Sequence, residues 1–234
     1  MPRKTTTPKE YVERLEETLS RRTRLDQEEA LRQEGIRQYR ILQSPLIEEL
    51  KREGYDVESL YALRNIGRPY KAAVPILLKW LPQVEDWHLK DSIVRALSVP
   101  WAKPAALLPL IVEFRTAAGP TIVDHVKWAI GNALSIIADD TVFDDVADLV
   151  QEKRHGRSRE MLAVALGRMK DPRAVDLLIK LLDDEEVAGH ALIAIRKLKA
   201  REAASRVEPF LNHPKAWVRS EAKKALARIT KLPR

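Results

Sequence analysis

The chain has 234 residues, of which 45% are apolar, and this is enough for one large domain with a sizeable core. It contains no cysteine, which excludes disulfides, thiolate zinc sites and a cysteine nucleophile. The formal net charge of +7 is uneven, because residues 190–234 carry +9, residues 1–40 carry +2 and residues 41–189 carry −4. A basic C-terminal end favours either an anionic partner or a solvated helical surface.

Residues 1–43 are predicted to form an N-terminal helical cap or arm. The stretch Thr7-Pro8-Lys9-Glu10 fits a capping box, and Asp26 with Glu29 fits a second helix start. We therefore expect two charged helices, with a new start at Ser44-Pro45. No apolar run resembles a signal peptide, and no segment reaches the roughly 18 apolar residues of a membrane span. We expect a cytoplasmic protein without membrane association.

From residue 44 onward, amphipathic segments recur in a pattern that ends in Ala-Leu or Ala-Ile. The first residues of these pairs serve below as reference alanines: Ala62, Ala96, Ala133, Ala165, Ala194 and Ala225. Second amphipathic segments lie between them, and breakers mark the joints at 67–69, 118–120, 171–172 and 213–214. Apolar residues follow helical rather than alternating spacing. The pattern predicts six antiparallel helix pairs stacked side by side.

The segment "VEPFLNHPKAWVRSEAKKALARI" (207–229) resembles a HEAT repeat, and the stretches at about 172–182 and 187–198 resemble the short bacterial, PBS-lyase-type subclass. Its Pro209, Val218-Arg219 and Ala225-Leu226 carry the resemblance, and a basic residue six before the reference alanine recurs as Lys90, Lys127 and Arg159. The resemblance implies an all-α fold: a right-handed α-solenoid of about six HEAT-like helix pairs over residues 44–234, with residues 1–43 as cap. It also implies that the second helix of each pair lines a concave groove.

Positions eight, five and one before the reference alanine share one helix face, separate from the apolar face of Ile93, Leu97, Ile130 and Leu134. These positions hold polar and aromatic side chains in successive repeats. The predicted groove residues are Tyr61, His88, Asp91, Arg95, His125, Trp128, Asn132, Arg157 and Glu160. Aromatic and arginine side chains are typical of binding hot spots. The same residues also fit an internal network of ion pairs between repeats, and both interpretations stay open.

The sequence favours a non-enzymatic binding or scaffold protein whose partner is a protein. The alternative is nucleic-acid binding through a basic patch in the C-terminal repeats, consisting of Lys215, Arg219, Lys223, Lys224 and Arg228. A more remote alternative is an alkylpurine DNA glycosylase with HEAT-like repeats, because Asp91 lies beside Arg95 with Trp128 one repeat on. The acidic middle segment opposes it.

Other catalytic interpretations fail on motifs. None of the five histidines precedes Glu, as the di-iron sites of HEAT-type deoxyhypusine hydroxylases would require, and no HExxH, Walker A, GxGxxG or GxSxG motif occurs. The acidic clusters at 138–140 and 182–187 fall between helices, where Asp usually caps. We expect no catalytic residues, no metal and no cofactor.

Overall fold

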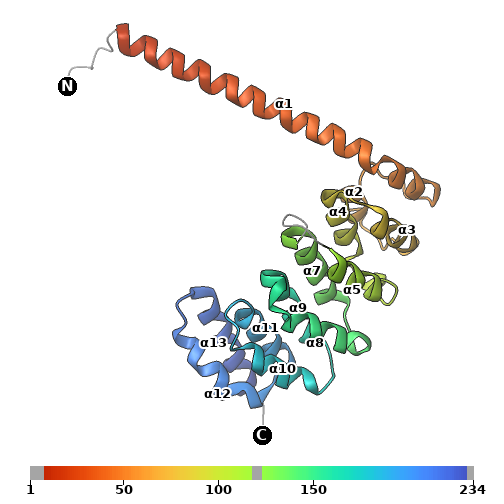
Figure 1. Cartoon of the computed structure of the whole chain (residues 1–234), viewed down its shortest axis with the longest axis vertical. Coiled ribbons are helices and arrows are strands. Elements are labelled where there is room, and N and C mark those ends of the chain that lie inside the picture. The colour runs from red at the N-terminus through yellow and green to blue at the C-terminus, as the bar shows by residue number, and fades with distance from the viewer. Residues whose placement is uncertain (1–7, 118–122, 231–234) are drawn as a thin grey trace. The chain divides into compact units, whose positions relative to one another are not determined.

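The structure is a computed structural model that describes residues 8–117 and 123–230, with side chains from residue 20 and, after the gap, from residue 125. These residues form helices and no β-strand (Figure 1). The α-helices are α1 (Pro8–Arg52), α2 (Leu60–Arg64), α3 (Ala73–Trp80), α4 (Trp87–Leu97), α5 (Leu107–Thr116), α7 (Trp128–Ile137), α8 (Phe143–Gln151), α9 (Glu160–Leu166), α10 (Arg173–Leu181), α11 (Ala188–Leu198), α12 (Ala204–Val207) and α13 (Ala216–Thr230). A π-helical turn, Val123–Lys127, precedes α7, and short 3-10 segments join several helices, among them Lys153–Arg159 and Glu208–Asn212.

The contacts divide the chain into two units, Met1–Pro45 and Leu46–Arg234. The expectation of two helices in the first unit is wrong, because α1 runs without interruption through Asp26 and through Pro45. Glu29 does not begin a helix. Its carboxylate instead accepts bonds from Arg32 at 2.8 Å and from Gln33 at 2.7 Å, three and four residues further along α1. Pairs at these spacings stabilise a polar helix along its length.

The second unit contains two kinds of helix. Those carrying the reference alanines, α2, α4, α7, α9, α11 and α13, are called the second helices, and each packs against the next in a continuous row. The first helices, α3, α5, α8, α10 and α12, pack against α4, α7, α9, α11 and α13 respectively. The predicted helical segments and the breakers at 67–69, 171–172 and 213–214 are therefore confirmed, whereas the breaker at 118–120 lies outside the described residues.

The core lies between the two rows. The apolar face predicted on the second helices is confirmed, because Ile93, Leu97, Ile130 and Leu134 are fully buried. Gly131 marks a close approach of α7 to α9: a Cβ at this position would lie 3.1 Å from the Cβ of Met161. Glycine therefore costs helix propensity but allows tight packing of two second helices.

Candidate binding face on the second helices

The residues predicted to line the groove are distributed along consecutive second helices and the turns that lead into them. They are Tyr61 on α2; His88, Asp91 and Arg95 on α4; His125 in the π-helical turn; Trp128 and Asn132 on α7; Arg157 in the 3-10 segment Lys153–Arg159; and Glu160 on α9. Tyr61 is 73% exposed and Trp128 is 37% exposed, values that are high for large aromatic side chains. We call the outward side of these helices the second-helix face.

Three aromatic rings stack across two repeats. The ring of Trp87 lies 3.6 Å from that of His88 and 4.7 Å from that of His125, with interplanar angles of 27° and 22°. The side chain of His88 is 57% exposed. The structure thus brings two predicted residues, His88 and His125, together through a tryptophan that connects α4 to the turn before α7. The stack forms a flat, partly exposed surface of the kind that proteins use for contacts.

Asp91 and Arg95 form an ion pair within α4, with 2.6 Å between Nε of Arg95 and Oδ2 of Asp91. The other oxygen of Asp91, Oδ1, is buried without a hydrogen-bond partner in the described structure. Arg95 also lines a cavity of about 280 Å³, together with Asn132 from α7 and Arg64 from α2. Arg95 therefore serves both an internal pair and an open pocket between neighbouring second helices.

A second pocket, of about 400 Å³, lies at the predicted residues Arg157 and Glu160. Nε of Arg157 is 3.1 Å from the carboxylate of Glu160, and Nε2 of His190 is 3.9 Å from it. Burial, the largest cause, lowers the pKa of His190. Trp217 from α13 covers Gly189, where a Cβ would come within 2.1 Å of the indole ring. The pocket combines an aromatic wall with charges of both signs.

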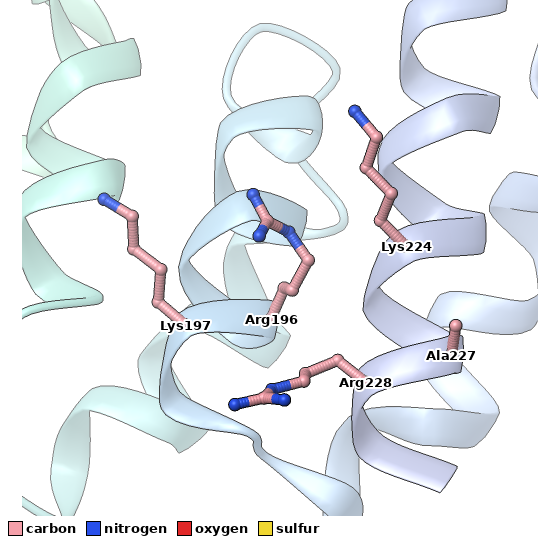
Figure 2. Close-up of a pocket in the computed structure, with 5 residues that line it drawn as sticks. All are labelled: Arg196, Lys197, Lys224, Ala227 and Arg228. Carbon is pink, nitrogen blue, oxygen red and sulfur yellow. The ribbon is translucent and has the colours of Figure 1, made fainter. Parts of the chain in front are cut away.

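The residues of the predicted basic patch have different surroundings. Arg219 donates to the carbonyls of His213 and Pro214, at 2.8 Å each, so it ties the start of α13 to the preceding turn. Lys215 lies at the pocket with Trp217, and Lys223 is exposed on α13. The remaining two, Lys224 and Arg228, line a third cavity of about 580 Å³ together with Arg196 and Lys197 of α11 (Figure 2).

Sequence reasoning missed Trp217, Arg196 and Lys197, although the repeat register contained a signal for Trp217 and for Lys197. Trp217 lies eight residues before Ala225, the position that His88 and His125 occupy in their repeats. Lys197 lies three residues after its reference alanine. The positions three after and one before the reference alanine supply most of the residues that line the cavity at Arg95 and the cavity at Lys197.

The basic residues six before the reference alanine have a structural role. Lys90 Nζ lies 2.5 Å from the carboxylate of Glu113 on α5. Arg159, only 1% exposed, contacts Asp184 at 2.7 Å and Glu186 at 2.5 Å. The equivalent Lys127 is buried over the ring of Phe114, with its Nζ 3.4 Å from Nδ1 of His155.

The two acidic clusters are also used within the fold. Asp139 caps the turn at Thr141, and Asp140 accepts the backbone N–H of Lys170 at 2.6 Å. Asp184 is the partner of Arg159. Across the described residues no group of three His, Asp or Glu side chains is placed to hold a metal ion. No helix within these residues has the length and apolar character to cross a membrane.

A comparison with protein families finds one match, and a comparison with curated proteins finds none. The matched segment, residues 158–184, contains α9 and α10 and holds both members of the buried pair Arg159–Asp184. The resemblance predicted from the sequence is thereby confirmed for this stretch: residues 158–184 form a PBS lyase HEAT-like repeat.

Proposed function

We propose that this chain is a non-enzymatic scaffold that binds a protein partner through the second-helix face of a right-handed HEAT solenoid with six helix pairs. In this array the last turns of α1, from Leu46 to Arg52, form the first helix of the pair completed by α2. The concave side is then the second-helix face.

The observation that supports this function is the set of exposed aromatic side chains at repeat-related positions on the second helices. Tyr61, Trp128 and Trp217 are 73%, 37% and 45% exposed. The same helices line cavities that contain arginine, lysine and carboxylate groups, and Trp217 lines one of these cavities. Large rigid aromatic surface beside arginine is the composition of interface hot spots.

The test begins with affinity purification from the native host and mass spectrometry to identify a partner, followed by calorimetric titration of the purified pair. Replacing Trp128 by Ala should weaken binding by at least about tenfold, because loss of a hot-spot aromatic costs about 2 kcal/mol or more. The matched control is Leu108→Ala on α5, a first helix, where the side chain is 61% exposed. An equal affinity for both variants would place the interface elsewhere.

Nucleic-acid binding is the second candidate, and the cavity lined by Arg196, Lys197, Lys224 and Arg228 favours an anionic ligand of some kind. The glycosylase alternative receives no comparable support, because Asp91 is engaged by Arg95 and its second oxygen is buried. Salt dependence separates nucleic acid from protein as the ligand, since neutralising many phosphates makes affinity fall steeply with salt.

A further inference from the structure

The positions three after the reference alanine change character along the row of second helices. In the first three repeats they hold Asn65, Val99 and Ile136, and in the last three they hold Arg168, Lys197 and Arg228. Lys197 on α11 and Arg228 on α13 line one cavity. The last repeats therefore carry a ladder of cations on adjacent helices.

The cavity between α11 and α13 holds the upper part of this ladder. Figure 2 shows Arg196 on α11 and Arg228 on α13 with their guanidinium groups in the space between the two helices. Lys224 follows on α13, and Lys197 extends from the other side of α11. The volume of about 580 Å³ is larger than a single ion needs, and the space is open to solvent rather than enclosed.

One carboxylate already lies among these cations. Glu221 contacts Lys224 at 2.6 Å and Arg196 at 3.5 Å. Nε of Arg196 has no acceptor in the described structure. Neither Lys197 nor Arg228 has an acidic partner among the described residues. The four lining cations therefore exceed the one carboxylate, and the geometry around Glu221 shows that a carboxylate fits between the two helices.

Assembling these cations is unfavourable without an anion. The pKa of Lys197 is lowered by burial first, then by Arg168 and Arg196. A bound carboxylate would oppose that shift, because an opposite charge favours the protonated lysine. Cations that repel one another in the free protein favour an anionic ligand at this position.

We propose that the cavity between α11 and α13 binds an acidic segment of the protein partner in polyproline II conformation. This inference rests on the proposed function and names the chemistry of the partner. Packed helices lie about 8–10 Å apart, and a polyproline II chain, with three residues per turn and a rise of about 3.1 Å per residue, advances about 9 Å per turn and returns side chains i and i+3 to the same side. A segment with a carboxylate at every third residue therefore matches the ladder.

The distribution of acidic groups favours a peptide over a nucleic acid. The neighbouring pocket of Trp217 places Glu160, Glu185 and Glu186 among Arg157 and Lys215, so it continues no purely basic track for a phosphate backbone. Duplex DNA carries a charge about every 1.7 Å along its axis and needs a longer basic track than three repeats supply. A peptide can place its few carboxylates at the ladder and neutral residues beside these glutamates.

The test is fluorescence anisotropy with the full chain and a labelled peptide that has Glu at every third position in a Gly/Ser background. The same peptide with Gln in place of Glu is the ligand control. In the cavity variant, Lys197→Met with Arg228→Met, affinity for the Glu peptide should fall at least about tenfold, since each charge-assisted bond contributes well over 1 kcal/mol. Neither replaced residue leaves a carboxylate unpaired, so thermal stability should be unchanged or slightly higher.

The matched protein control is Lys71→Met with Lys180→Met. It removes the same charge from exposed positions on the side of the first helices, and affinity should stay within about twofold. The inference is overturned if the Glu peptide does not bind at low salt, or if both double variants weaken it equally. The acidic peptide is also the wrong ligand if a single-stranded or duplex oligonucleotide binds more tightly than the Glu peptide and its binding depends on Lys197 and Arg228.

The variant Trp128→Ala separates this inference from the proposed function. It should keep the Glu peptide and lose the protein partner, because Trp128 does not line the cavity. If the Lys197/Arg228 variant binds the partner fully and Trp128→Ala does not, the proposed function stands and the acidic-segment inference is refuted. If the peptide binds in the cavity but no partner depends on Trp128, the acidic-segment site stands and the proposed function fails.

Discussion

Replacing Arg159 by Met tests whether the buried ion pair ties two repeats together. The side chain is 1% exposed, and its guanidinium donates to Asp184 at 2.7 Å, Glu186 at 2.5 Å and the carbonyls of Val150 and Gly156 at 3.2 and 3.1 Å. Methionine retains much of the stem but removes every donor. The variant therefore leaves two carboxylates and two carbonyls without this partner.

The magnitude follows from how exposed each remaining partner is. Breaking a buried pair by removing one member costs about 3–5 kcal/mol. Glu186 is 46% exposed and can turn to water, whereas Asp184 is 16% exposed and keeps one backbone bond, from the N–H of Glu186 at 3.2 Å. We expect the lower end, a loss of about 3 kcal/mol in the free energy of unfolding. The control Arg206→Met breaks the exposed pair with Asp183 and should cost less than about 1 kcal/mol.

Urea unfolding followed by circular dichroism measures both variants, and a pH series gives an independent check. Arg159, the largest favourable influence, lowers the pKa of Asp184 below its ordinary value of 3.8. The stabilisation is therefore present above that value and is lost as the pH falls through the folded-state pKa. The difference between wild type and Arg159→Met should shrink in acid. Equal losses for Arg159→Met and Arg206→Met at neutral pH would refute this reasoning.

Three further predictions concern packing and charge between the two rows of helices. Gly167→Ala should lower the unfolding free energy by about 1–3 kcal/mol in urea, because the new Cβ would lie 2.7 Å from a backbone atom of α11; no loss would mean that the helices move apart freely. By the same assay, Lys90→Met should lower the unfolding free energy by about 3 kcal/mol, because it leaves the carboxylate of Glu113 buried without its partner. Lys127→Met should be neutral or stabilising, because it removes a buried charge that has no carboxylate contact. The pKa of His155 is lowered from 6.5 mainly by burial, so wild-type stability should fall as the pH drops below 6.5, and His155→Gln should flatten that part of the profile.

The helices and their buried faces could be predicted because they depend on the spacing of apolar residues and breakers within each segment. Apolar spacing and the breakers placed the second helices correctly. Pro45 misled, because a proline usually ends or kinks a helix, yet α1 passes through it. Asp26 led to the wrong prediction of a helix start, because aspartate can cap a helix but also occurs in the middle of a polar helix such as α1.

The candidate site was predicted less completely, because it depends on which side chains meet between repeats. The repeat register placed His88 and His125 on related positions but did not show that Trp87 stacks on both. It also grouped Arg219 with Lys224 as one basic surface, although Arg219 is occupied by two carbonyls of its own turn. Such lateral contacts are set by helix stacking and turn geometry, which no single helix encodes.

The register separates two uses of basic residues on the same helices. Six residues before the reference alanine, Lys90 and Arg159 each contact a carboxylate inside the fold. Three residues after the alanine, Lys197 and Arg228 find no acidic partner among the described residues. The pairs of Lys90 and Arg159 stabilise the folded chain by themselves, whereas we propose that a ligand from outside stabilises Lys197 and Arg228. A partner that carries acidic groups is therefore the simplest reason for the second set of cations.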